Sequence, residues 1–254
     1  MEELDEEFAI WRNAQIQAGV FDARNLPNKL FDAYVNHFTK ALELGGGMDY
    51  LAIEYGVMPE ELALLMRENI VLFSGAKTFN YVISTEALLR QNGQLITPKE
   101  FKELASQNFQ LYNKTWLQTE YETALKQASN LKDWQEFQAN KSDFPLLEFR
   151  TVGDQRVSEA CRMKNGIVKR VDDPFWKSHS PMTHYGCRCE LYPLQLNEKS
   201  ITGIPKGLPK NDLGFRENIR ETGRIFDKTH PYFDIPKGSK RFAKKNFNLE
   251  YSGK

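Results

Sequence analysis

The sequence has no long hydrophobic run, and it contains only three cysteines. No apolar stretch approaches the roughly 20 residues that a membrane-spanning helix needs. The first residues are acidic, whereas a secretory signal begins with basic residues followed by an apolar segment. We therefore expect no membrane segment and no export by such a signal. An odd number of cysteines without a signal predicts reduced thiols in a cytoplasm rather than a disulfide framework.

Glycine-rich phosphate-binding loops are also missing. The run at residues 45–47 lacks the Lys-Ser/Thr continuation of a P-loop, and no G-x-G-x-x-G follows a predicted strand. Both absences disfavour an ATPase or a dehydrogenase. The 34 basic and 34 acidic residues cancel, which excludes a strongly basic nucleic-acid protein of the histone kind.

The charges are unevenly distributed along the chain. Residues 1–70 carry 13 acidic and 5 basic residues, whereas residues 191–254 carry 7 acidic and 13 basic residues. Two interpretations stay open, because the two ends could face different partners or each could be an ordinary solvated face.

Apolar residues at helical spacing dominate the first 144 residues. Thr97 followed by Glu100 is typical of a capping box, and Pro59 with the two glutamates after it is typical of a helix start. The expected helices lie around residues 8–11, over 30–42 up to a triple glycine, from residue 59 onward, from residue 98 onward and over 117–131.

The pattern changes to β alternation after Phe144. Short segments at 147–152, 166–171 and 189–192 predict strands, and Asn165-Gly166 is typical of a hairpin turn. We predict an α+β fold with three regions. These are a helical region at 1–144, a small antiparallel β unit with a metal site at 145–194 and a basic tail at 195–254 that wraps the body.

All three cysteines fall near one histidine in this β unit: Cys161, His184, Cys187 and Cys189. Thiolates and imidazole are the ligands that Zn²⁺ prefers in tetrahedral structural sites. Four protein ligands would close the site, which predicts a structural zinc rather than a metal-activated water. The spacing alone leaves three possibilities open: a metal site, free thiols packed as small hydrophobes, and a redox disulfide. The neighbouring Arg162 and Arg188 are expected to offset remaining thiolate charge.

Catalytic alternatives are weaker. Either cysteine of the His-x-x-Cys-x-Cys segment could pair with His184 as nucleophile and base, but two cysteines flanking an arginine suit a single nucleophile poorly. A metal-dependent nuclease or other hydrolase would need an open coordination position and a general base. The nearby candidates are Glu190, Asp172 and His179. Because the Asp172–Trp176 segment reads more simply as a turn with an aromatic anchor, we expect a protein without enzymatic activity.

An ordered set of short segments carries a family resemblance. They are residues 151–156, Cys161, 165–168, 171–176, 180–181 and 187–189. In this order they resemble the phage Mu F-like minor head (head morphogenesis) proteins. Further segments at 68–69, 73–78, 116–121 and 230–233 are also similar, so the resemblance covers roughly residues 60–235. Its motif residues are Asp154, Arg156, Gly166, Asp172, Asp173, Phe175, Trp176 and Arg188.

The resemblance implies a structural protein of the virion, present in few copies in the phage head and in the host cytoplasm during assembly. It implies partners among the head proteins, above all the portal protein, and a role in capsid assembly and in packaging or ejecting DNA. Similar domains also occur fused to toxin modules, but only about 60 residues follow the motif here. Some members carry histidine at the position of Cys161 and none at that of His184, so the resemblance supports Cys187 and Cys189 more directly.

Two smaller sets of residues complete the expectations. A carboxylate and a guanidinium in one turn, Asp154 and Arg156, are expected to orient the β unit through hydrogen bonds. The tail offers cations that could neutralise the phosphates of packaged DNA, although a solubilising tail is an equal alternative. These cations are Lys237, Lys240, Arg241, Lys244 and Lys245.

Overall fold

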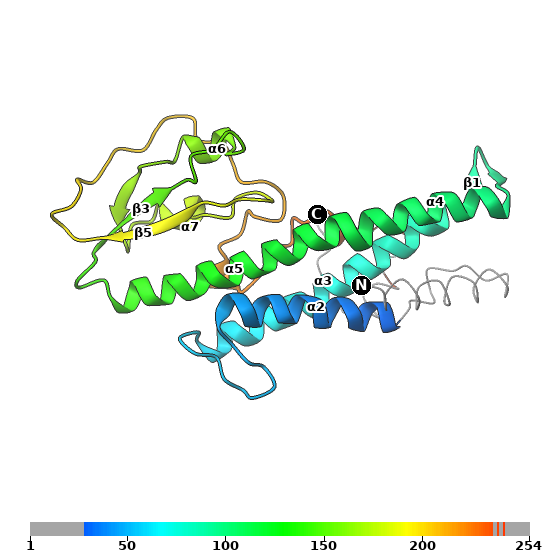
Figure 1. Cartoon of the computed structure of the whole chain (residues 1–254), viewed down its shortest axis with the longest axis horizontal. Helices are drawn as coiled ribbons and strands as arrows, with labels where there is room; N and C mark the ends of the chain where they lie inside the picture. Colours follow the sequence, from blue (N-terminus) through cyan, green and yellow to red (C-terminus); the bar gives the residue numbers. More distant parts are fainter. Residues whose placement is uncertain (1–27, 236–237, 239–240, 242–254) are drawn as a thin grey trace. The chain divides into compact units, whose positions relative to one another are not determined.

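The computed structural model describes residues 28–235, 238 and 241 (Figure 1). Within this part of the chain, contacts define two compact units. The first contains residues 28–39, 70–121 and the described residues from 232 onward, and the second contains residues 40–69 and 122–231. Each unit is built from separate stretches of the chain, so the division of the sequence at 144 and 194 stays a prediction.

Four helices account for most of the regular structure. They are α2 (Asn28–Gly46), α3 (Glu60–Ala87), α4 (Pro98–Gln110) and α5 (Trp116–Ala139). A π-helical segment, η1 (Leu111–Thr115), joins α4 to α5. These bounds confirm the expected helices from residue 28 onward, whereas the helix expected around residues 8–11 lies outside the described residues. The capping box is confirmed too, since the Thr97 side chain accepts from the Glu100 amide and the Glu100 carboxylate accepts from the Thr97 amide.

A short hairpin between α3 and α4 was not predicted. Strands β1 (Arg90–Gln91) and β2 (Gln94–Leu95) pair antiparallel across a two-residue turn. Asn92 and Gly93 occupy that turn with φ angles of 51° and 83°. Asn-Gly is the dipeptide that such a turn favours, because both positions need a positive φ. The signal was therefore present in the sequence, but the flanking residues are exposed and carry no β alternation.

The second unit contains a three-stranded antiparallel sheet, as the sequence predicts. Strands β3 (Leu146–Arg150), β4 (Val168–Arg170) and β5 (Glu190–Leu194) are arranged in the order β4-β3-β5. The central strand pairs Leu147 with Lys169 on one side and with Pro193 on the other. Leu147 and Phe149 face the main core of the unit, whereas Leu146 packs on the opposite face with two other buried side chains.

The Asn165-Gly166 dipeptide does not close a two-residue hairpin, which corrects one expectation. The connection from β3 to β4 is long and contains the short helix α6 (Glu159–Arg162). Gly166 (φ +80°) forms a turn after this helix, and its amide donates to the Phe149 carbonyl at 2.8 Å. The Asn165 carboxamide accepts from the Thr151 amide at 3.0 Å. The dipeptide thus forms the turn between α6 and β4, the edge strand of the sheet.

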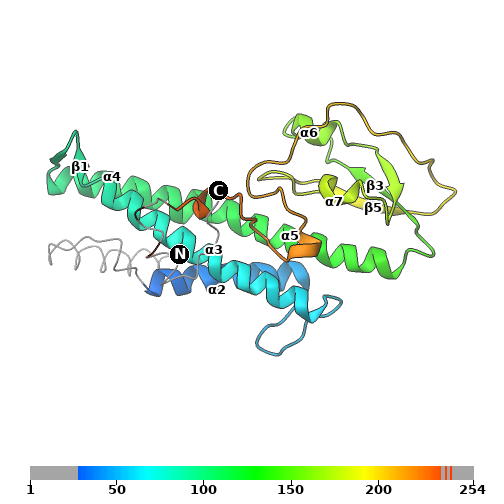
Figure 2. The same cartoon turned by 180° about the vertical axis from the view of Figure 1, so that it is seen from behind.

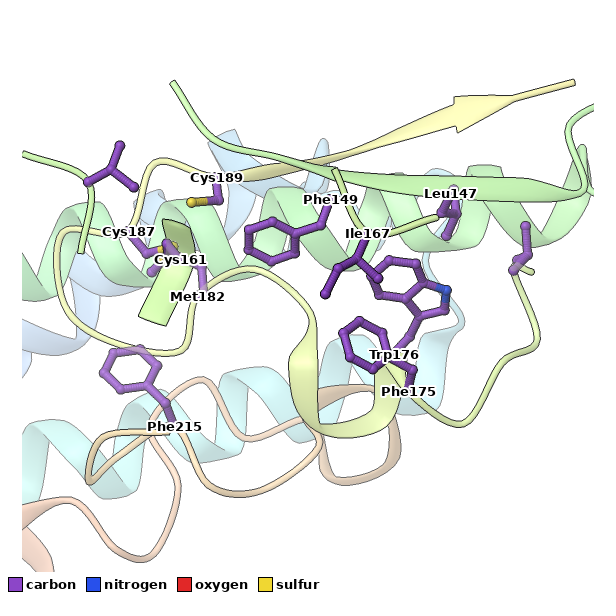
Figure 3. Close-up of a cluster of buried hydrophobic side chains, with 12 residues drawn as sticks. Leu147, Phe149, Cys161, Ile167, Phe175, Trp176, Met182, Cys187, Cys189 and Phe215 are labelled. Atoms are coloured by element: carbon purple, nitrogen blue, oxygen red, sulfur yellow. The ribbon is translucent and has the colours of Figure 1, made fainter. Parts of the chain in front are cut away.

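Buried aromatic and sulfur-containing side chains form the core beneath this sheet (Figure 3). Trp176, at the start of α7 (Trp176–His179), is 1% exposed, and its indole donates to the Arg170 carbonyl at 2.8 Å. Residues 195–231 add only one short helix, α8 (Ile219–Thr222), yet they contribute the buried Phe215 to this core. The 3₁₀ turn η2 (Pro231–Phe233) follows near the end of the described chain.

Candidate metal centre

Three of the four residues expected as ligands converge at one end of the core beneath the sheet. Cys161 comes from α6, whereas His184 and Cys187 come from the loop before β5. The Cys161 sulfur lies 3.8 Å from the Cys187 sulfur and 3.2 Å from Nε2 of His184. In the part of the chain that the structure describes, this is the one group of three or more His, Cys, Asp or Glu residues whose ligand atoms all lie within 4.8 Å of one another.

The two nitrogens of His184 have different partners. Nδ1 lies 2.7 Å from the Tyr185 carbonyl oxygen, which can only accept a hydrogen bond. Nδ1 therefore carries the proton in the neutral ring, and the lone pair of Nε2 points towards the Cys161 sulfur and the Ser158 hydroxyl at 2.9 Å. A metal-ligating histidine is held in the same way, because its second nitrogen donates to a fixed acceptor.

Local sequence signals explain how the two segments present these side chains. Ser158 is the N-cap of α6, and its hydroxyl accepts from the Cys161 amide at 3.2 Å. This cap fixes the first turn that carries Cys161. In the other segment, Gly186 has a φ of +69°, a conformation that L side chains rarely adopt. The glycine lets the chain reverse between His184 and Cys187, so that both side chains face Cys161.

The fourth expected ligand, Cys189, is not in this mutually close group, but its thiol contacts two members of the group. Hydrogen bonding with Cys161 and then Cys187 raises the pKa of Cys189. The same kind of contact, first with Cys161, lowers the pKa of Cys187. All three cysteines are buried, and Figure 3 shows them together at one end of the core. The contacts among the three thiols therefore favour the thiolate form at Cys187 and the thiol form at Cys189.

The imidazole balances part of this negative charge. Hydrogen bonding to Cys161, followed by that to Cys187, raises the pKa of His184 to about 10. Without a metal the ring is therefore protonated at neutral pH and pairs with a thiolate. A divalent ion would replace the proton on Nε2 and the remaining thiol protons, because only the deprotonated forms are ligands.

A buried lysine that the sequence interpretation missed lies beside the thiols. Lys164 is 1% exposed, and its ammonium donates to the Thr183 hydroxyl at 3.2 Å. Burial lowers the pKa of Lys164, whereas the nearby sulfur atoms of the three cysteines oppose that shift. A site with three thiolates and one imidazole around Zn²⁺ has a net charge of −1, which this ammonium would offset. No pattern in the sequence signalled this contact, because lysine is ordinarily exposed.

Arg188, one of the two arginines expected to offset thiolate charge, interacts electrostatically with Cys189 and Cys187, but its hydrogen-bond partner is another group. Arg188 donates from both terminal nitrogens to the Asp154 carboxylate, with both distances at 2.7 Å. These hydrogen bonds lower the pKa of Asp154 to about 2. Arg162 is exposed. Asp154 also accepts from the Arg156 amide at 3.0 Å, so this carboxylate links the segment after β3 to the loop between the two late cysteines.

The candidates for a hydrolytic site are engaged elsewhere. Glu190 pairs with Lys126 at 2.9 Å, and Asp172 pairs with Lys141 at 3.3 Å. The ring of His179 stacks on Phe175 with a centroid distance of 4.6 Å. In the described residues, no carboxylate joins the group of Cys161, His184 and Cys187.

Of the remaining predicted residues, some support the turn before α7, and the possible DNA-binding cations lie in the tail. The Asp173 carboxylate accepts from the Phe175 amide at 2.8 Å, and Phe175 and Trp176 are both buried. Of the tail cations, Arg241 is exposed. Lys237, Lys240, Lys244 and Lys245 lie outside the described residues.

The donor set fits a metal ion on chemical grounds. Thiolates and an Nε2 imidazole with a fixed tautomer suit zinc better than magnesium or calcium, which prefer oxygen ligands. The cluster of Cys161, His184 and Cys187 could therefore hold a metal ion, with Cys189 adjacent. Because no carboxylate of the described residues belongs to the cluster, its donor set suits a structural centre.

These features define a mixed α and β protein with a thiol and imidazole cluster behind a small antiparallel sheet. Residues 52–192, more than half of the chain, match the family described as "Phage Mu protein F like protein". The chain belongs to this family, whose members are phage head morphogenesis proteins associated with the virion. No curated protein and no solved structure matches the chain significantly. No helix in the described residues has the length and apolar character needed to span a bilayer.

Proposed function

We propose that this protein is a minor structural protein of the phage head that binds the portal protein and aids capsid assembly and DNA packaging or ejection. The observation that carries the proposal is the family match over residues 52–192, which includes β3, β4, the start of β5 and the whole thiol cluster. The buried cluster supports a structural rather than a catalytic role, because its thiols and imidazole suit metal ligation and no carboxylate of the described residues joins them.

In this proposal a zinc ion is held by Cys161, His184 and Cys187, with Cys189 as the fourth ligand. Zinc supplies a cross-link between α6 and the loop before β5, and Lys164 offsets its residual charge. Four protein ligands exclude a reactive water, so the ion stabilises the fold and performs no hydrolysis. Arg241 and the four lysines around it would neutralise phosphates of the packaged DNA.

Quantitative mass spectrometry of purified heads tests the head assignment. We expect the protein in few copies relative to the major capsid protein, and we expect it to co-purify with the portal protein from disrupted heads. Its absence from heads that contain portal protein would overturn the proposal. Hydrolysis of DNA or peptide by purified protein, abolished by Cys187→Ser, would favour the hydrolase alternative instead.

A further inference from the structure

We infer that the loop at residues 47–58, here called the α2–α3 loop, docks into an apolar pocket bordered by basic side chains on another head protein. The inference rests on the proposed function, since it needs a head protein as partner. Figures 1 and 2 both show the loop as an open excursion beyond the ends of α2 and α3.

Hydrogen bonds within the loop give it a defined shape. Asp49 and Glu54 form an antiparallel bridge, in which the Asp49 amide donates to the Glu54 carbonyl at 2.6 Å and the Glu54 amide donates back at 2.9 Å. The Asp49 carboxylate also accepts from the amides of Leu51 and Ala52 at 2.9 and 3.0 Å. The tip is therefore closed by its own backbone and needs no cover from elsewhere to keep its form.

Buried side chains anchor both ends of the loop. Met48, Tyr50 and Met58 are 6%, 5% and 4% exposed. The Tyr50 hydroxyl donates to the Ala63 carbonyl at 2.8 Å. These anchors all belong to the second unit, as does the loop itself. The apolar residues between them thus remain outside while the ends stay fixed.

Large apolar side chains occupy the tip. Leu51 is 93% exposed and Ile53 is 70% exposed, and Val57 and Leu44 nearby in sequence are 49% and 70% exposed. A cluster of this kind on a loop marks an interaction site more often than a lone exposed leucine does. Ile53 also has a φ of +57°, a strained conformation for a β-branched residue. Glycine or asparagine would adopt this conformation with less strain, so the apolar side chain at this position carries a conformational cost.

Acidic residues predominate in the stretch of sequence that carries the loop. Residues 40–69 contain six acidic and two basic residues, a net charge of −4. Glu60 and Glu61, at the start of α3, are exposed close to the loop in sequence. A complementary protein surface therefore combines an apolar pocket with lysines or arginines around it. DNA and anionic bilayers are disfavoured partners, because both would repel the same carboxylates.

A second copy of this chain is the main competing partner. Residues 196–213 expose apolar side chains together with Lys199, Lys206 and Lys210, which could in principle receive the loop. The apolar side chains are Leu196, Ile201, Ile204 and Leu213. Contact between this segment and the loop of another copy would be a head-to-tail interface. The test must therefore separate self-association from binding to another head protein.

The test compares wild-type protein with the double variant Leu51→Asp/Ile53→Asp. Leu95→Asp is the matched control, because Leu95 is 69% exposed on β2. The probes are purified portal protein and purified major capsid protein of the same phage, measured by biolayer interferometry. Circular dichroism of each variant must match wild type. We expect the double variant to weaken binding to one probe by at least about tenfold and the control by less than about twofold.

The charge argument has its own pair of variants. Glu60→Lys should slow association with that probe at low ionic strength, whereas Glu103→Lys on α4 should not. Both residues are exposed. Each variant replaces a glutamate by a lysine and therefore changes the net charge by the same amount. Loss of the difference at high salt is expected, because screening removes steering between exposed charges.

Four outcomes overturn the inference. Equal binding by wild type and the double variant refutes the loop as the docking site but leaves the proposed function intact. If wild-type protein binds neither portal protein nor major capsid protein, both the inference and the proposed partner are refuted. Loop-dependent dimerisation in sedimentation velocity would assign the loop to a second copy. Loop-dependent binding to vesicles of phosphatidylcholine and phosphatidylglycerol would assign it to a membrane.

Discussion

The Lys77 ammonium lies 2.8 Å from the Glu120 carboxylate, and both side chains are buried within the first unit. Lys77 also donates to the Tyr112 carbonyl at 2.8 Å, in the π-helical segment η1. The Tyr232 hydroxyl donates to Glu120 at 2.9 Å. Burial lowers the pKa of Lys77 and raises that of Glu120, while the attraction between them opposes both shifts.

These contacts connect segments that are distant in sequence, two of which lie within the family match at residues 52–192. Lys77, Glu120 and Tyr232 fall in the segments 73–78, 116–121 and 230–233, which are distant in sequence. In the fold they form one buried polar network. The loss of one charged member of such a network is destabilising, because it leaves the other charge buried and unpaired.

Replacing one member of the ion pair should therefore destabilise the protein. We expect Lys77→Met to lower the free energy of unfolding by about 3–5 kcal/mol, because it leaves the Glu120 carboxylate buried and unpaired. The double variant Lys77→Met/Glu120→Leu should recover much of that loss. Urea denaturation of both variants measures the difference. Equal destabilisation by the single and double variants would contradict the account.

Asn69 forms a second long-range polar contact, which lies within the second unit. Its carboxamide donates to the Phe226 carbonyl and accepts from the Phe226 amide, both at 2.9 Å. Asn69 is 2% exposed, so Asn69→Ala leaves two buried backbone groups without a partner. We expect a loss of about 2 kcal/mol or more in urea denaturation.

The exposed Asn197 provides the control for this substitution. Asn197→Ala should change stability by less than about 0.5 kcal/mol. A similar effect of the two substitutions would show that the contact with Phe226 contributes little.

The pair of Asp154 and Arg188 predicts a specific acid response. The pKa of Asp154 is about 2 in the folded chain and about 3.9 in an unfolded one. Because the folded pKa is the lower one, the stabilising contribution is present above pH 4 and is lost as the pH falls towards 2. NMR titration of the Asp154 carboxyl carbon measures the folded value directly. In Arg188→Gln we expect it to rise towards about 3.9, and an unchanged value would mean that Arg188 does not cause the shift.

Local signals in the sequence predicted much of the fold. The period of apolar residues indicated α2, α3 and α5, and Thr97 with Glu100 indicated the start of α4. Alternation indicated β3 and β5, and a short run with β-branched residues indicated β4. The hairpin predicted at Asn165-Gly166 was wrong, because a turn dipeptide indicates that the chain reverses direction but not which elements the turn joins.

Side-chain contacts between segments distant in sequence could be predicted only in part. The ligand candidates Cys161, His184 and Cys187 could be proposed, since thiols and imidazole are scarce and distinctive. The burial of Lys164 beside them could not, because lysine is ordinarily exposed and only the fold brings it to the cluster. For Arg188 the sequence suggested a neighbour for the thiolates, but it did not indicate that the guanidinium also binds Asp154.

The metal content of the purified protein tests the central claim most directly. Inductively coupled plasma mass spectrometry should find about one zinc per chain, as expected for a single closed site, in protein prepared without chelator. Cys161→Ser and Cys187→Ser should each reduce this value to near zero, whereas Trp176→Phe, in the same core, should retain the ion. Cys189→Ser decides whether the third thiol is the fourth ligand. Metal-free wild-type protein whose thermal midpoint equals that of Cys187→Ser would contradict the account.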